Sequence, residues 1–119
     1  MLAMPLLAAC TGQTQKVPDG SQATVTASGD RQAHFDRRPG EMSACFSFEA
    51  MGRYRELEFD MSVSPPLTTA AKKYRSDTSN LWAAEFHDSG GGTDVMLRKG
   101  TASASDLGEV WRLIERCAA

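Results

Sequence analysis

Three acidic residues, Glu56, Glu58 and Asp60, alternate with the apolar residues Leu57 and Phe59. On a β-strand such side chains project from one face at a spacing of about 6.8 Å. Carboxylates at that spacing can bind a cation or divide the acid and base roles of catalysis, but catalysis needs surroundings that separate their pKa values. A uniformly wet strand face does not separate them, so we expect a solvated face, with an electrostatic surface for a partner as the alternative.

A second group surrounds the run Gly90-Gly91-Gly92. These glycines lack the Lys of a phosphate-binding loop and stand between two strand-like segments instead of opening a helix. The run therefore predicts a hairpin tip, a place where binding functions are common. The partner-binding residues expected at this tip are Asp88, Ser89, Gly91 and Asp94.

Two histidines and four methionines are soft ligands of the kind that a copper or zinc site uses. They are His34, His87, Met42, Met51, Met61 and Met96, and no pair of them has His-x-x-His or Met-x-x-Met spacing. The chain also lacks the Gly-x-Ser-x-Gly elbow of serine hydrolases. We therefore expect no metal, no cofactor and no catalytic residue.

Near the N-terminus, an uncharged apolar run ends in Leu7-Ala8-Ala9-Cys10, and a polar segment follows it. These four residues resemble the lipobox of bacterial lipoproteins, which ends a signal peptide. The resemblance implies that residues 1–9 are a signal-peptide remnant and that Cys10 is lipidated. Thr11 stands where lipoproteins of the inner membrane usually carry Asp. The resemblance therefore implies a lipid anchor in the outer membrane, with the protein facing the periplasm.

With Cys10 lipidated, two cysteines remain, Cys45 and Cys117. An even pair in an exported domain favours a disulfide, because that compartment is oxidising. Closing a loop of about seventy residues would stabilise the fold by about 4 kcal/mol. Two buried free thiols are the main alternative, and a nucleophilic cysteine is disfavoured because neither histidine is close in sequence.

The composition bounds the possible architectures. The chain has 119 residues, enough for one domain. Thirteen Lys and Arg against fifteen Asp and Glu give a net charge of −2, which argues against a nucleic-acid partner. No apolar run approaches the length of about 20 residues that spans a membrane. We expect a flexible tether over residues 10–23 and a single globular domain over residues 24–119.

Alternation of apolar and polar residues predicts most of the strands. It is strict over residues 56–63 and predicts a strand over residues 54–64, and the alternation of Phe46 and Phe48 with polar neighbours predicts a strand over residues 44–50. These two segments would form a hairpin turning at Gly52. Further strands are expected over residues 24–28, 32–36, 81–87 and 94–99, while residues 67–75 are either a short helix or a loop.

The C-terminal segment changes to a helical period. Its apolar residues recur at intervals of three and four, and Ser105 or Asp106 is expected to cap the helix, with Glu109 completing a capping box. The apolar residues are Leu107, Val110, Trp111, Ile114 and Cys117. The fold class predicted is α+β: an antiparallel sheet of about five or six strands in hairpins, with an amphipathic C-terminal helix packed on it.

These observations favour a non-enzymatic, lipid-anchored protein that binds another envelope protein through its loops and the wet face of its sheet. In size and layout alone it resembles small exported lipoproteins that act as inhibitors of cell-wall hydrolases or as immunity proteins. A structural or assembly role in an envelope complex is the closest alternative. A carrier of a small ligand or metal is a second class, and an enzyme is a third.

Overall fold

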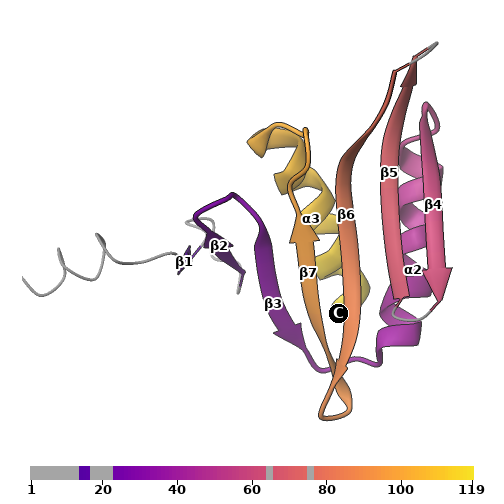
Figure 1. Ribbon diagram of the computed structural model, residues 1–119. Coiled ribbons are helices and arrows are strands. Elements are labelled where there is room, and N and C mark those ends of the chain that lie inside the picture. The colour runs from indigo at the N-terminus through magenta and orange to yellow at the C-terminus, as the bar shows by residue number, and fades with distance from the viewer. Residues whose placement is uncertain (1–13, 17–22, 64–65, 75–76) are drawn as a thin grey trace, which may run out of the picture.

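The computed structural model describes residues 14–16, 23–63, 66–74 and 77–119, which form one antiparallel sheet and two helices (Figure 1). The strands are β1 (Thr14–Lys16), β2 (Thr24–Thr26), β3 (Arg31–Phe35), β4 (Leu57–Val63), β5 (Pro66–Tyr74), β6 (Asp77–Ser89) and β7 (Gly92–Arg98). The helices are α2 (Pro39–Arg53) and α3 (Ala104–Ala118). The α+β class is confirmed, with seven strands in the sheet, more than expected.

The strand order is β1-β2-β3-β7-β6-β5-β4, and all neighbouring strands are antiparallel. Strands β4 to β7 follow one another as a meander, whereas β3 lies on the far side of β7. The chain therefore crosses the sheet between β3 and β4, and α2 makes this crossing. Both helices lie on the same face of the sheet (Figure 1), so the opposite face is open.

The core lies between the sheet and the two helices. All five apolar residues expected on the inner side of α3 are buried, and the Trp111 ring lies 6.0 Å from the ring of Phe35 on β3. From α2, the Phe46 ring lies 5.6 Å from both Trp82 and Phe86 of β6. Because aromatic side chains bury large areas, these ring contacts dominate the attachment of both helices to the sheet.

The strand expected over residues 44–50 is wrong, and so is the hairpin at Gly52, because this segment belongs to α2. Pro39 occupies the start of the helix, where its fixed φ favours helical geometry. Met42, Phe46 and Ala50 recur every four residues and are buried against the sheet. Phe48 faces solvent with 78% of its surface exposed, whereas Phe46 is buried. The two phenylalanines therefore do not share a buried face, and their alternation does not indicate a strand.

The helix or loop expected over residues 67–75 is also wrong, because this segment forms β5 between β4 and β6. Thr68 is fully buried, and its hydroxyl lies 2.9 Å from the hydroxyl of Ser47 on α2. β-Branched residues such as threonine fit a pleated, half-buried surface. The position of this segment between β4 and β6 therefore makes it a strand, although its own residue pattern did not indicate one.

Two boundaries also differ from expectation. The N-cap of α3 is Ser103, whose hydroxyl accepts a hydrogen bond of 3.0 Å from the backbone N–H of Asp106, so the cap expected at Ser105 or Asp106 is wrong. Within the segment expected to be a tether, residues 14–16 form β1 and pair with β2. Residues 1–13, with Cys10 and the rest of the lipobox, lie outside the described residues.

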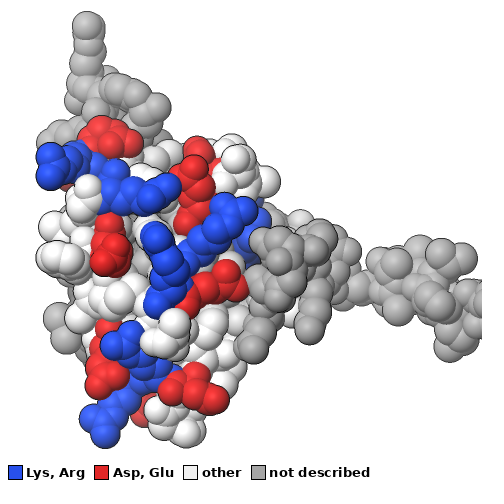
Figure 2. Space-filling view, turned by 180° about the vertical axis from the view of Figure 1, so that it is seen from behind, with Lys and Arg blue, Asp and Glu red and all other residues white. Residues whose placement is uncertain are grey.

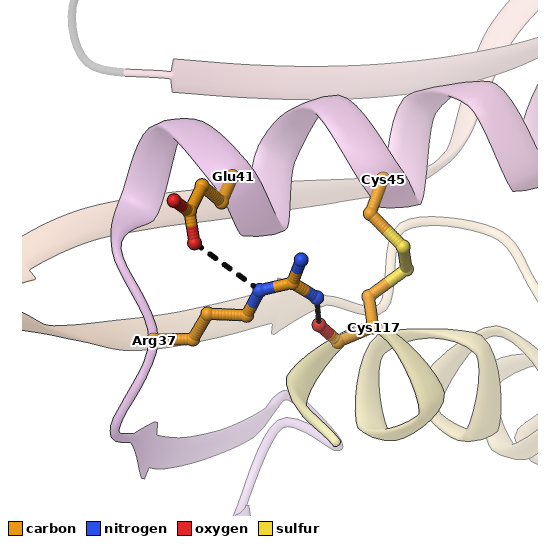
Figure 3. Close-up of a disulfide and its surroundings, with 4 residues drawn as sticks. All are labelled: Arg37, Glu41, Cys45 and Cys117. Atoms are coloured by element: carbon orange, nitrogen blue, oxygen red, sulfur yellow. Dashed lines mark hydrogen bonds and ion pairs between the residues drawn. A yellow bond between two sulfur atoms is a disulfide. The ribbon is translucent and has the colours of Figure 1, made fainter.

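A disulfide between Cys45 of α2 and Cys117 of α3 ties the two helices together, with the two Cα atoms 5.8 Å apart. Arg37 extends between the helices beside this bond (Figure 3), donates to the backbone oxygen of Cys117 and lies 3.4 Å from Glu41. The linked cysteines lie 72 positions apart in sequence. The bond therefore closes a loop that includes α2, β4, β5, β6 and β7, and it fixes the helix layer over the sheet.

Candidate functional site

The open face of the sheet carries both histidines of the chain in one row across three strands. In the sheet register, Asp94 of β7 is the partner of His34 on β3 and of His87 on β6. The neighbours Val95 and Phe86 are buried on the helix side, so these three polar side chains point away from the helices. The sheet register thus assembles a His-Asp-His row from positions that are far apart in sequence.

The row is held by a short hydrogen bond. Nδ1 of His34 lies 2.7 Å from Oδ1 of Asp94, and Nε2 of the same ring lies 3.5 Å from Oδ1 of Asp36. The hydrogen bond from His34 holds the pKa of Asp94 below its ordinary value. Asp94 is therefore ionised at neutral pH and accepts the proton on His34 Nδ1.

A second set of ion pairs continues the row along β6 and β7. Oε1 of Glu85 lies 3.0 Å from His87 Nε2, and Oε2 accepts a hydrogen bond of 2.5 Å from Arg98 Nε. Partial burial by itself favours the neutral acid, but the hydrogen bonds from Arg98 and His87 outweigh it and lower the pKa of Glu85. Arg98 Nη1 also lies 3.8 Å from Asp30, which joins the end of β7 to the turn before β3.

These side chains surround a shallow pocket of about 480 Å3 on the open face. The polar residues that line it are Thr24, Gln32, Glu85, His87, Asp94 and Arg98. Both histidine rings lie within reach of carboxylates, His34 of Asp94 and Asp36, and His87 of Glu85. Chemically, the arrangement presents fixed charges and hydrogen-bonding groups on the open face.

The hairpin tip predicted from the glycine run is present between β6 and β7. Gly90 and Gly91 have φ values of 62° and 87°, the left-handed region that glycine adopts without strain. Gly92 starts β7, and a Cβ there would lie 2.9 Å from His34 Nε2 and 2.5 Å from the backbone oxygen of Phe35. Glycine at this position is therefore what lets the end of β3 and the His34 ring lie against the tip.

The structure distributes the expected tip residues over two surfaces. Asp94 belongs to the row on the open face, and a hydrogen bond from Ser89 contributes to lowering its pKa. Asp88 and Gly91 instead line a hollow beside the start of α2. The tip therefore brings only Ser89 and Asp94 to the polar site.

The acidic residues expected on one strand face are also divided. Phe59 packs on Trp82 in the core, so Glu58 and Asp60 on either side of it point to the open face. They lie on β4, three strands away from β7. Glu56 precedes β4 and lines a hollow next to Trp82 and Glu109 on the helix side. These three carboxylates therefore do not form one row.

The sequence interpretation considered His34 and His87 only as metal ligands, and it missed Glu85, Arg98 and Gln32, which complete the site. A signal was present: each histidine stands next to a phenylalanine, Phe35 or Phe86, inside a predicted strand. Alternation puts neighbouring residues on opposite faces, so a buried phenylalanine implies an outward histidine. What the pattern cannot supply is the register that places both histidines beside Asp94.

The chain matches none of the protein families, curated proteins or solved structures with which it was compared. In the described part of the chain, no group of three or more His, Cys, Asp or Glu is arranged to hold a metal ion. No helix in that part is long and apolar enough to cross a membrane.

Proposed function

We propose that this chain is a non-enzymatic, lipid-anchored protein of the outer membrane that faces the periplasm and binds another envelope protein through the open face of its sheet. The observation that carries the proposal is the row of His34, Asp94 and His87, which side-chain hydrogen bonds hold in place before any partner arrives. Preorganised polar groups lose little side-chain entropy on binding, which favours recognition.

The charge of the open face supports a partner with a basic surface. Four carboxylates, those of Asp30, Asp36, Glu85 and Asp94, take part in the network, against one guanidinium, that of Arg98. The site is therefore acidic, and complementary charge would speed the encounter with a basic partner and fix its orientation. Inhibition of, or immunity to, a cell-wall hydrolase is one form that such binding takes.

The disulfide supports export. A bond between Cys45 and Cys117 persists in oxidising compartments and is rare in the cytosol. The lipobox-like residues that end at Cys10 support an anchor at a membrane for the same chain. Both features fit a domain held near the membrane by acyl chains.

The binding proposal is tested with the full lipidated chain, immobilised in mild detergent and exposed to an envelope extract of its host. A captured protein is then purified and titrated. We expect the double variant Glu85→Gln, Asp94→Asn to weaken binding at least about tenfold, with affinity falling as salt rises. Glu56→Gln, which lies outside the open face, is the matched control. A partner that binds the double variant as tightly as the unmodified protein contradicts the proposal.

The anchor is tested separately. Mass spectrometry of the membrane-bound protein should find acyl chains on Cys10 and no residues 1–9, and Cys10→Ser should release the protein from the membrane. An unmodified Cys10 with residues 1–9 attached would contradict the anchor. The binding proposal would still be tested separately by the titration with the captured partner.

A second candidate function, a carrier of a small polar ligand, is favoured by the pocket of about 480 Å3. Calorimetry of the purified protein with a periplasmic small-molecule extract distinguishes it, because a carrier binds a ligand without any protein partner.

A further inference from the structure

The outer side of α2 exposes apolar surface that the described residues of the chain leave uncovered. Phe48 and Met51 have 78% and 46% of their surface exposed, and both lie opposite the side on which Phe46 packs into the core. Ala44, one turn before Phe48, is also exposed. Residues three and four apart share one side of a helix, so these three form a continuous outer stripe.

The two ends of the outer stripe carry opposite charges. Glu41 lies in the first turn of α2 and is exposed, although it also lies 3.4 Å from Arg37 of its own chain, and Arg55 is exposed just after the helix. Arg55 lines a hollow of about 640 Å3 together with Phe48 and Met51. The stripe therefore runs from an acidic end through an apolar centre to a basic end.

The stripe has the symmetry that an antiparallel pair of identical helices requires. Glu41 and Arg55 are each seven residues from Phe48, and Ala44 and Gly52 are each four residues from it. If two copies of α2 cross antiparallel with Phe48 on the two-fold axis, Glu41 of each copy faces Arg55 of the other. Ala44 then faces Gly52, and small residues at facing positions let helices approach closely.

We propose that this surface joins two copies of the chain in a symmetric dimer, with Phe48 at its centre and Glu41 and Arg55 paired across it. An exposed apolar patch with a polar rim is typical of an interaction site. The mixed charge favours a second copy over an anionic membrane, because a membrane would repel Glu41 and the neighbouring Glu49. The helix-covered side shows acidic and basic side chains intermingled, with no area of a single sign (Figure 2).

The dimer leaves the proposed binding face accessible. The outer side of α2 points away from the sheet, whose other face carries His34 and Asp94 (Figure 1). Two such faces in one dimer would engage a repetitive or dimeric partner with raised avidity. The dimer itself does not depend on the proposed function, and its test requires no partner.

Gly52 provides a variant that separates the dimer from the fold. A Cβ at position 52 meets nothing within 4 Å in the monomer, so Gly52→Gln adds a side chain to open space and improves helix propensity. In the dimer, the same side chain would be pressed against Ala44 of the other copy. We expect Gly52→Gln to leave thermal unfolding of the monomer unchanged or raise its midpoint, and to weaken dimerisation at least about tenfold.

The experiment is sedimentation equilibrium of the full chain carrying Cys10→Ser, over a range of concentrations. We expect a monomer–dimer equilibrium that Phe48→Ser and Gly52→Gln each shift toward monomer, whereas Met61→Ser, which removes another exposed apolar side chain, does not. Arg55→Glu should weaken the dimer, and adding Glu41→Arg to the same chain should restore it.

Three results would overturn the dimer: a chain that stays monomeric at its highest soluble concentration, a dimer whose affinity Gly52→Gln does not change, or failure of Glu41→Arg to restore the affinity that Arg55→Glu lost. Binding of the monomer to vesicles containing anionic phospholipid, abolished by Phe48→Ser, would assign the stripe to the membrane instead.

Discussion

Gly92 lies so close to His34 that a Cβ at position 92 would stand 2.9 Å from Nε2 of the imidazole ring. The same Cβ would also meet the backbone oxygen of Phe35 at 2.5 Å, where no flexible side chain can give way. The hairpin tip therefore limits where the ring can lie and supports its hydrogen bond to Asp94. Gly92, which the sequence predicts only as a turn residue, thus helps to determine the position of His34 in the polar row.

From this contact we expect Gly92→Ala to displace His34 and the end of β3. Displacing the ring breaks its hydrogen bond to Asp94, so the pKa of Asp94 should rise toward its ordinary value. Carboxyl-detected NMR titration measures that pKa. The strain should also lower the free energy of unfolding by about 1–3 kcal/mol. Gly40→Ala is the control, since Gly40 does not have a left-handed φ and a Cβ there meets nothing within 4 Å. An unchanged pKa of Asp94 in Gly92→Ala would contradict this role.

The ion pair between Glu85 and Arg98 predicts a pH dependence of stability. The pKa of Glu85 is lower in the folded protein than in the unfolded chain, so its contribution is present above the unfolded pKa of about 4.3. That contribution is lost as pH falls through the folded pKa. We therefore expect Arg98→Met to lower the free energy of unfolding by about 1 kcal/mol at pH 7. On acidification, the free energy of unfolding of this variant should fall by less than that of the unmodified protein.

Thermal unfolding at a series of pH values between 7 and 3 measures this difference. Arg112→Met, on the exposed side of α3, removes a guanidinium without touching Glu85 and should leave the pH profile unchanged. If Arg98→Met and the unmodified protein lose the same stability on acidification, the ion pair between Glu85 and Arg98 is not the cause of the pH dependence.

The elements that the sequence predicts correctly are those in which one face is buried and the other is wet. In β4 and α3 the apolar period follows the core contacts, so strict alternation and three-four spacing indicate the right structure. The pattern fails in α2 because Phe48 is apolar without being buried, which makes a helix resemble a strand. It fails in β5 because the strand depends on its neighbours more than on its own residues.

The polar site was less predictable than the fold. His34 and Asp94 become neighbours only because α2 carries the chain across the sheet and β3 pairs with β7. Such a register is not encoded in a local pattern. Asp94 and Ser89 were expected to bind a partner because they lie at the tip, but their relation to the histidines follows from the sheet alone.

The disulfide between Cys45 and Cys117 should account for a large share of the stability. Its loop of about seventy residues predicts a loss of about 4 kcal/mol when both cysteines are replaced by serine. Urea unfolding monitored by tryptophan fluorescence measures the loss, because Trp82 and Trp111 are both buried in the core between the helices and the sheet. A reducing agent should lower the unmodified protein to the stability of the double variant and leave that variant where it is. If the unmodified protein and the double variant are equally stable without reducing agent, the disulfide does not stabilise the fold.

The two phenylalanines of α2 provide the sharpest test of this architecture. Phe46 is fully buried between Trp82 and Phe86, whereas Phe48 is largely exposed. We expect Phe46→Ala to lower the free energy of unfolding by about 3–5 kcal/mol and Phe48→Ala to change it by less than about 0.5 kcal/mol, as measured by urea unfolding at a concentration where the chain is monomeric. In a strand, residues two apart share a face, so both substitutions would then be costly or both mild. Only a helix that turns Phe46 into the core and Phe48 outward predicts so large a difference between them.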